Sequence, residues 1–472
     1  MVGIQGEKVR ALPILLPQLI AKARSVLLAG FICFACAARA QDSTMLNLLT
    51  PQEQSAQTKT ETSVAETSRT TSIQEPPPPT EGPDPSVEVQ GGDNGVSATQ
   101  NKFHYGLHLT LRGVYDDNIN ISHTNRINDY YIAIEPGITV GYGDIVGREG
   151  NYIRLDYQPS IFLFIDHDEV DSVQHLIHLE GFHRFSRLAL TLGQDVSILD
   201  GADVNLITSG TNSSTGTIAN IDVGGRTRFT VVGTRLGWSY DLSGKTFLSG
   251  EFLNTLYAYQ NNLISSDSFS GSLYINYNYS PKLAVGIGGS GGYNWVDSPT
   301  PEQTFEQANV RATYQATGKI SLNASAGAEF RQFGNNGAND HVSPVYELGA
   351  TYLPFDGTTV TLTGSRRTLN SAIFAGQDFA STNIIAGIRQ RMFERIYLSV
   401  SGGYENSDYF SALAGVNATR HDDYYFVEPA VDVSIMRFWT AGAYYLHREN
   451  ESNFVAFSFY DNQVGVRTTL TF

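Results

Sequence analysis

Cysteine is almost absent from this 472-residue sequence, and the two that occur, Cys33 and Cys36, lie near the N-terminus. Every position after Cys36 therefore lacks disulfides, thiol nucleophiles and zinc-thiolate sites. Long apolar runs are missing too. A membrane-spanning helix needs about 20 consecutive apolar residues, and no such run follows the N-terminal region. The sequence thus excludes a helical membrane protein and cysteine-based chemistry.

Positive charge is scarce. The formal net charge is -16, which argues against nucleic acid as a partner because phosphate binding needs basic patches. Only 17% of residues are charged, whereas the sequence holds 45 Gly, 25 Tyr and 25 Phe. Many small and aromatic residues with few charges suit a sheet whose two faces meet different media.

The N-terminal residues 1–40 have the pattern of a cleavable export signal. Basic residues precede a short apolar stretch from Val26 to Ala35, and Ala38-Arg39-Ala40 has the small–x–small spacing that a signal peptidase accepts. A transmembrane anchor and a lipoprotein cut before Cys36 are the weaker alternatives. A second apolar run, Ala11 to Ile20, lengthens the segment, so translation could start later than Met1.

Residues 41–101 differ in composition from the rest. They are acidic, rich in Pro, Thr, Ser and Gln, and contain the run Pro76 to Pro79. Because so little apolar surface cannot offset the entropy of ordering, we expect a disordered segment with a stiff polyproline spacer. A tether explains it better than a partner-binding role.

From residue 102 to Phe472 the apolar residues alternate with polar ones, and the alternation often exceeds the five or six residues of an average strand. A tilted strand crosses the hydrocarbon layer in about 9–11 residues. Alternation predicts eighteen strands, near 103–115, 130–143, 151–165, 173–185, 188–198, 228–241, 245–259, 268–279, 282–295, 303–315, 319–332, 343–353, 358–368, 380–391, 395–405, 422–435, 437–448 and 455–471.

The connections sort by parity. Links after even-numbered strands are short, apart from 144–150, and links after odd-numbered strands are mostly long and polar. This is typical of a Gram-negative outer-membrane barrel. The sequence therefore predicts an all-β fold, a closed antiparallel transmembrane β-barrel of 16–18 strands with both termini in the periplasm. Trp238 and Tyr240 at one rim, and Tyr293 and Trp295 at the other, suit interfacial aromatic girdles.

Two parts of the sequence resemble known patterns. The terminal residues resemble the signal that the outer-membrane barrel assembly machinery reads; they are Tyr460, Val464, Val466, Leu470 and Phe472. The opening Gly113-Val114-Tyr115-Asp116-Asp117-Asn118-Ile119, followed by Tyr130-Tyr131 and Glu135-Pro136-Gly137, resembles the β-barrel porin-2 family. That resemblance implies an outer-membrane barrel, in some members one encoded with exopolysaccharide-secretion operons.

Catalytic and cofactor signals are weak. On the fourth predicted strand His175 and His178 point to opposite faces, and His175 and His183 lie about 26 Å apart at about 3.3 Å per residue. We therefore expect no metal site, no cofactor and no enzymatic activity, although a triad assembled in space would leave no local motif.

Charged residues on the polar faces of the strands are the candidate lumen lining, because an Arg or Lys facing lipid at mid-bilayer costs about 2–4 kcal/mol. They are Arg112, Glu135, Arg154, Asp156, Glu180, Arg235, Arg311, Glu329, Arg331, Arg389, Glu405, Glu428, Asp461 and Arg467. Such charges either line a water-filled lumen or pair across a filled one. The long connection 199–227 could fold inward as a constriction or form a surface loop.

Two functions fit these observations. The first is a passive channel for small solutes, or a barrel associated with exopolysaccharide export. The second is a structural or adhesion barrel whose outward loops bind at the cell surface. The expected partners are outer-membrane lipid, the assembly machinery and small solutes or polysaccharide. Neither the solute nor the oligomeric state follows from the sequence.

Overall fold

The computed structural model describes residues 102–145, 150–200, 221–261, 263–335 and 337–472. The chain divides into two units after Arg69, and every described residue belongs to the second. The predicted signal peptide (1–40) and tether (41–101) lie outside the described residues and stay predictions. Within the described part, no helix has the length and apolarity needed to cross a membrane.

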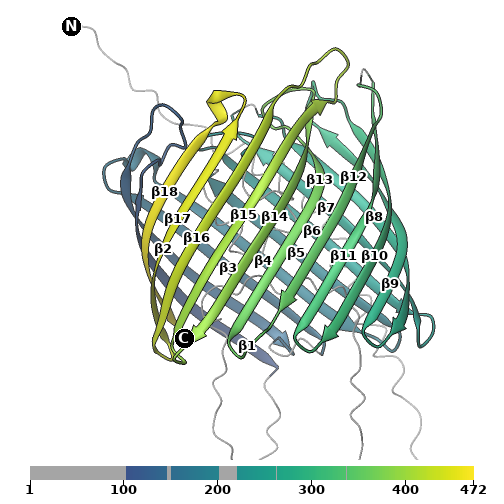
Figure 1. Ribbon diagram of the computed structural model, residues 1–472, viewed down its shortest axis with the longest axis horizontal. Coiled ribbons are helices and arrows are strands. Elements are labelled where there is room, and N and C mark those ends of the chain that lie inside the picture. Colours follow the sequence, from purple (N-terminus) through teal and green to yellow (C-terminus); the bar gives the residue numbers. More distant parts are fainter. Residues whose placement is uncertain (1–101, 146–149, 201–220, 262, 336) are drawn as a thin grey trace, which may run out of the picture. The chain divides into compact units, whose positions relative to one another are not determined.

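Eighteen antiparallel strands form one closed sheet (Figure 1). The strands are β1 (Phe103–Asp116), β2 (Asp129–Gly143), β3 (Tyr152–Phe164), β4 (Ser172–Arg184), β5 (Leu188–Asp200), β6 (Arg228–Asp241), β7 (Thr246–Tyr259), β8 (Ser266–Ser280), β9 (Leu283–Val296), β10 (Gln303–Thr317), β11 (Ile320–Phe333), β12 (His341–Tyr352), β13 (Thr358–Asn370), β14 (Gln377–Met392), β15 (Ile396–Ser411), β16 (His421–Met436), β17 (Trp439–Ser452) and β18 (Phe459–Thr471). Among the described residues, two short 3-10 helices lie in loops, η1 (Asp168–Val170) and η3 (Val455–Phe457).

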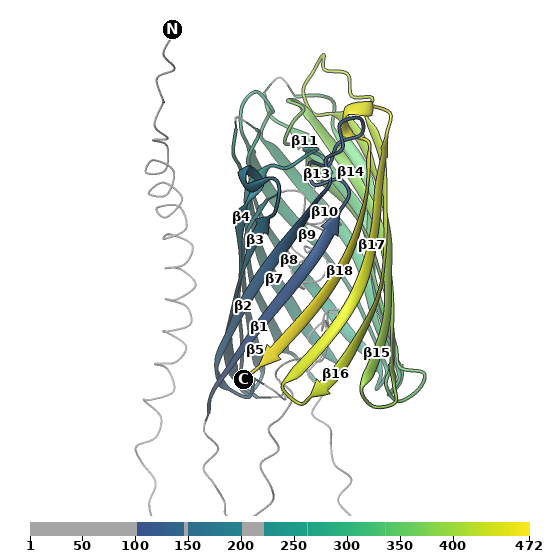
Figure 2. The ribbon, with the colours of Figure 1, turned by 90° about the vertical axis from the view of Figure 1, so that its left-hand side faces the viewer.

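Closure comes from the pairing of the first strand with the last. β1 pairs with β2 on one side and with β18 on the other, from His108↔Thr471 to Asp116↔Gln463 (Figure 2). The C-terminal Phe472 extends this seam, because its N–H donates to the carbonyl of Leu107 and its carbonyl accepts from the N–H of the same residue. The barrel therefore has no free sheet edge between its first and last strands.

The prediction of eighteen strands is confirmed, and the differences are in the bounds. β15, predicted at 395–405, continues to Ser411. β14, predicted at 380–391, begins three residues earlier, at Gln377. In this stretch Asp378, Phe379 and Ala380 are all buried. A strand that is covered on both faces does not alternate in polarity, so its end escapes detection by alternation.

The two ends of the barrel differ. The connections after even-numbered strands lie with Phe472 at one end, here called the turn end, and the connections after odd-numbered strands lie at the opposite loop end (Figure 1). This matches the predicted parity. The connection after β2, residues 144–151, is again the long exception at the turn end.

Outward faces are apolar. On β18, Val464 and Val466 are 55% and 60% exposed, whereas the alternating Asp461 and Gln463 are buried. Exposed aromatic rings gather toward both ends of the strands: Trp238, Tyr240 and Phe438 toward the turn end, Tyr130 and Trp295 toward the loop end. An apolar band between two aromatic belts is the exterior that a membrane barrel presents to lipid.

Arginine placed on the two faces of β8 tests this assignment. Leu273 faces outward at the centre of the strand, and its neighbour Ser272 faces inward beside Ser290. Leu273→Arg should destabilise the barrel by about 2–4 kcal/mol, because the charge meets hydrocarbon. Ser272→Arg is the matched control and should have a much smaller effect. Urea unfolding from lipid vesicles measures both, and equal losses would contradict the assigned faces.

Candidate functional site

All fourteen predicted lumen residues lie on the faces opposite the exposed apolar side chains, but they are not equally accessible. Glu135, Glu329, Arg331, Glu405 and Asp461 are buried. These five are covered by other parts of the protein, so they do not line an open surface. Whether the accessible ones line a conducting path stays a prediction.

Several predicted charges pair along the wall rather than across the lumen. Arg112 contacts Glu135 on the neighbouring strand, with Nη2 to Oε1 at 2.5 Å. The Nε of Arg154 lies 2.8 Å from Asp156 on its own strand. Arg467 binds Asp432 with two N–H groups, at 2.8 and 2.7 Å. Such local pairs fix the side chains against the wall.

Two ion pairs that are more exposed to solvent lie on other strands. The Nε of Arg235 lies 3.3 Å from Glu251, and both side chains are about one-third exposed. A second pair, Arg367 with Glu347, has N···O at 3.9 Å. Inward serines and amides follow each other along β8: Ser266, Ser268, Ser270, Ser272, Asn276 and Asn278. These residues offer hydroxyls, amides and balanced charge rather than one dominant sign.

The wall changes course between β12 and β13. Their ladder joins residues 346–352 to residues 360–366 and does not continue toward the loop end, although both strands do. There His341 of β12 stacks on Phe410 of β15, with ring centroids 3.9 Å apart. In a flat wall these two strands would lie three strand spacings apart, about 14 Å. The loop-end part of β13–β15 therefore folds over the inner face of β12.

The loop-end parts of β13 and β14 form a hairpin that is folded inward, here called the infolded hairpin. A buried polar network forms where this hairpin meets the wall. Arg331 on β11 donates to Glu329 at 2.9 Å and to Gln303 at 2.6 Å. Gln303 in turn donates to Asp378 of β14 at 3.1 Å. Asn370 of β13 also donates to Asp378, at 2.9 Å. The network thus joins β10 and β11 to β14, which lies four positions from β10 and three from β11 along the sheet.

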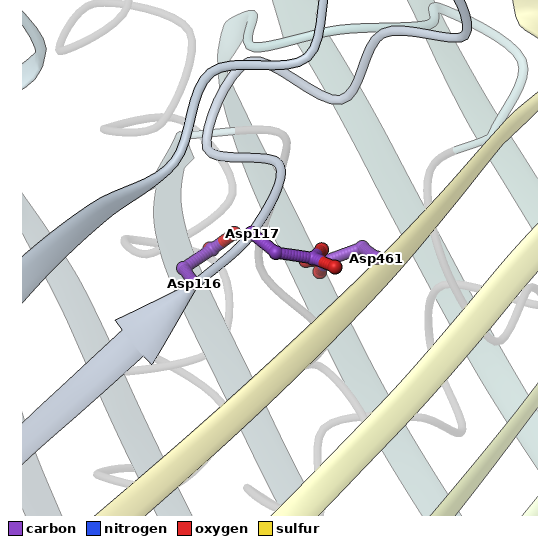
Figure 3. Close-up of side chains that lie close together, drawn as sticks. All are labelled: Asp116, Asp117 and Asp461. Atoms are coloured by element: carbon purple, nitrogen blue, oxygen red, sulfur yellow. The ribbon is translucent and has the colours of Figure 1, made fainter.

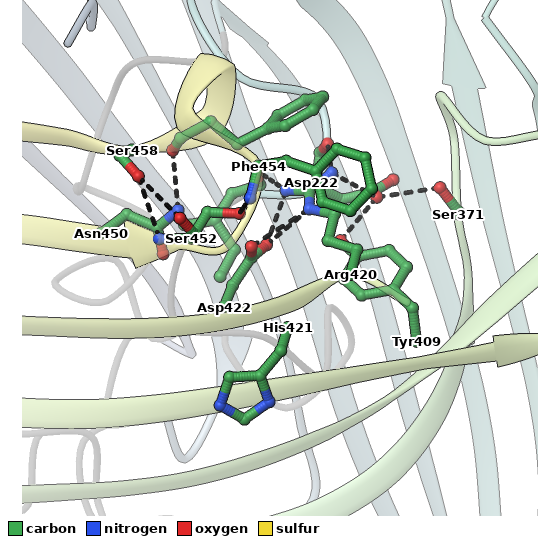
Figure 4. Close-up of polar contacts among 12 residues, drawn as sticks. Asp222, Ser371, Tyr409, Arg420, His421, Asp422, Asn450, Ser452, Phe454 and Ser458 are labelled. Carbon is green, nitrogen blue, oxygen red and sulfur yellow. Dashed lines mark hydrogen bonds and ion pairs between the residues drawn. The ribbon is translucent and has the colours of Figure 1, made fainter. Parts of the chain in front are cut away.

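The opposite face of the hairpin carries a second cluster (Figure 4). Asp222, at the described end of the long connection, accepts hydrogen bonds from the Ser371 hydroxyl at 2.9 Å and the Tyr409 hydroxyl at 2.8 Å. It also accepts one from the backbone N–H of Ala372. Burial raises the pKa of the Asp222 carboxyl, and the charge of Arg420 opposes that shift. This carboxylate ties the long connection to the tip of hairpin β13–β14.

Arg420 completes the cluster from the β15–β16 loop. Its guanidinium donates to the carbonyls of Ile221 and Asp222, and one nitrogen lies 2.6 Å from Asp422. It also lies 3.7 Å from the ring centroid of Phe457 in η3. A planar guanidinium that bonds in its plane and stacks on its face is held firmly. One side chain thus joins three loop-end connections.

Apolar side chains cover part of the inner wall nearby. The buried cluster takes inward residues from β1, β2, β3, β16, β17 and β18 and loop residues above them: Val114, Ile119, Ile121, Tyr131, Ala133, Phe162, Phe164, Ile221, Tyr424, Phe426, Tyr444, Leu446 and Phe459. Ile119 and Ile121 belong to the first loop and Ile221 to the third. The loop end of the lumen is therefore filled in part, on the side formed by β16–β18 and β1–β3.

Three carboxylates lie together at the β1–β18 seam (Figure 3). Asp116, Asp117 and Asp461 each offer an oxygen within 4.8 Å of the others. Arg126 pairs with Asp117, and Arg448 pairs with Asp461 at 2.6 Å. Because two guanidiniums already offset this charge, the group is better explained as a joint that closes the barrel than as a cation site. The expectation of no metal stays a prediction.

The histidines of β4 follow the predicted faces. His175 faces outward beside Tyr157, and His178 faces inward with its Nδ1 2.6 Å from Asp195.

Sequence reasoning missed Asp222, Arg420 and Asp378, because their partners lie far away in the chain. The expectation that 199–227 folds inward falls largely on residues 201–220, outside the described residues. Its described end packs on Tyr409.

No model of a protein family matches the chain, and no curated protein matches it. The resemblance to the β-barrel porin-2 family therefore stays a prediction. Solved structures give similarities at low identity. The outer membrane protein OpdK from Pseudomonas aeruginosa is 11% identical over 78% of this chain and 99% of its own, with a TM-score of 0.40. OccK2 (OpdF) from the same organism, solved with glucuronate, is 11% identical over 78% and 98%, with a TM-score of 0.41. A loop-deletion mutant of OmpT from Vibrio cholerae is 10% identical over 79% and 100%, with a TM-score of 0.32.

Removing the charge of Arg331 tests the buried network. Arg331→Met leaves Glu329 and Asp378 without their cation in a buried site, and should cost about 3–5 kcal/mol of stability. Arg235→Met is the matched control, because the Arg235–Glu251 pair is partly exposed and should cost about 0–1 kcal/mol. Urea unfolding in vesicles measures both. Similar losses for the two variants would show that the hairpin does not bury Arg331.

Proposed function

We propose that this protein is an outer-membrane channel that passively conducts small polar solutes. The observation that carries the proposal is the closed wall with an apolar exterior and a polar interior. A barrel of 16–18 strands is wide enough for an aqueous lumen. In this proposal the loop end faces the outside of the cell, and both ends of the barrel chain lie in the periplasm after removal of the signal peptide.

The accessible inner residues support small polar solutes. The row of hydroxyls and amides on β8 can hydrogen-bond to water or to a polyhydroxyl solute as it passes. The paired charges Arg235–Glu251 and Arg367–Glu347 give weak local fields of both signs. We therefore expect a weakly selective channel.

A second candidate function is an anchoring barrel whose loops bind at the cell surface. One observation favours it: buried networks occupy the loop end, around Arg331 and around Arg420. Association with exopolysaccharide export and the absence of enzymatic activity stay predictions from the sequence.

Conductance separates the two functions. The purified full chain, refolded and inserted into planar bilayers, should give discrete current steps in salt solution. Liposomes that contain it should swell in small sugars. A detergent extract prepared without the protein is the control. A folded, inserted barrel that gives no current steps would favour the anchoring function.

Charge reversal at the open pair tests the solute path. Arg235→Glu places two acidic side chains side by side, so the channel should shift toward cations, as seen in the reversal potential under a salt gradient. His421→Gln is the control, because His421 lies at the loop-end rim beside Asp408, on the outward face. An unchanged reversal potential in Arg235→Glu would place the path elsewhere.

A further inference from the structure

The gap in the β12–β13 ladder gives the wall a seam with two matching edges. Continuing the register from Tyr346↔Arg366 toward the loop end would bring Pro344 opposite Thr368 and Val342 opposite Asn370. Both stretches are extended strands. The backbone could therefore form this missing ladder without changing its secondary structure. Pro344 has no N–H to donate, which makes the seam weaker than an ordinary strand pair.

The infolded hairpin reaches across the loop end of the lumen. At its tip, the carbonyl of Ala372 accepts from the N–H of Ile264, in the β7–β8 connection. The N–H of Gly376 donates to the hydroxyl of Thr300, in the β9–β10 connection. Asn370 of β13 contacts Asn294 of β9. A hairpin that belongs to β13 and β14 in the wall thus makes contacts with β9.

Polar contacts hold the hairpin on both faces. On the side toward β9–β11, Asp378 is bound by Gln303 and Asn370. On the other side, Ser371 and Tyr409 bind Asp222, which pairs with Arg420. Hydrogen bonds and ion pairs can be exchanged for water more readily than a well-packed apolar core, because water solvates the separated partners. Opening the hairpin would therefore transfer these polar groups from one another to water.

We propose that the loop-end part of hairpin β13–β14 is a gate, and that Asp222 and Arg420 form the latch that holds it shut. When the latch opens, the hairpin swings outward, pairs with β12 along the seam and clears the mouth of the lumen. The proposal rests on the proposed channel function, because a gate needs a path to control. It also reconciles a wide barrel with a filled loop end: the structure is the shut state.

A disulfide across the lumen locks the gate. In a background with Cys33→Ser and Cys36→Ser, the pair Asn294→Cys and Asn370→Cys should crosslink on oxidation, because the two amides are in contact. With the hairpin in the wall, β9 and β13 would lie four strand spacings apart, about 19 Å, and no bond could form. Oxidation should reduce the open fraction of single channels, and a reductant should restore it.

The control crosslink joins neighbouring strands outside the lumen. Asp408 of β15 and His421 of β16 are directly paired on the outer face of the rim, with their side chains in contact. Asp408→Cys with His421→Cys should crosslink without changing the open fraction. A complete Asn294→Cys/Asn370→Cys crosslink that leaves conductance unchanged would overturn the gate and leave the channel function standing.

Opening the latch should raise the open fraction of single channels, whereas the Asn294–Asn370 disulfide lowers it. Arg420→Met removes the cation that joins the three connections, and we expect the open-to-closed ratio to rise about tenfold, equivalent to about 1.4 kcal/mol. Asp222→Asn keeps the size of the side chain and its capacity to accept hydrogen bonds, so it serves if Arg420→Met fails to fold. Unchanged open-to-closed ratios in folded variants would overturn the latch.

Spin labels distinguish a failed gate from a failed channel. Labels at Ala375, on the exposed tip of the hairpin, and at Ser298, in the β9–β10 connection, should give one short distance in the wild-type barrel and a longer component in Arg420→Met. If neither protein conducts and the longer component appears, the hairpin moves and the channel function fails. If the wild type conducts and the distances are identical, the gate fails alone.

Discussion

The structure depends on one constraint: every backbone N–H and C=O that faces hydrocarbon must be bonded within the protein. A sheet meets this only by closing, and the β1–β18 pairing provides the closure. Much of the rest follows from it. Each strand must place one face in lipid and one inside, which fixes the alternation and leaves charged side chains only the inner face. The C-terminal residue takes part, since Phe472 exchanges two backbone hydrogen bonds with Leu107.

One strand pair, β12–β13, is an exception to this continuous pairing. The β12–β13 ladder stops toward the loop end, where an open edge would be costly in lipid. There the loop-end part of β13–β15 folds inward, and a second layer lies against the inner face of β12. The layer needs polar contacts, because the inner face of the wall is polar. The buried Arg331 network and the Asp222–Arg420 cluster supply them. The break in the wall and the filling of the mouth therefore have one explanation.

Sequence predicted the barrel well because its signal is local. Alternation depends on neighbouring residues, and loop parity depends on the lengths between strands. The same logic placed all fourteen charged residues on the inner face. It failed where a strand is covered on both faces: Asp378 and Ala380 have the parity of lipid-facing residues but lie buried inside. The contacts between Asp222 and Tyr409, or Gln303 and Asp378, join distant segments, and no local pattern marks them.

The most direct test of the central claim, lipid outside and water inside, is a nitroxide scan along β8 from Ser270 to Ile275 in reconstituted membranes. Collision with oxygen, which concentrates in lipid, should peak at Gly271, Leu273 and Ile275. Collision with a water-soluble nickel complex should be higher at the alternate positions and low at these three. A profile without a two-residue period, or one in which both faces meet the nickel complex equally, would contradict the account.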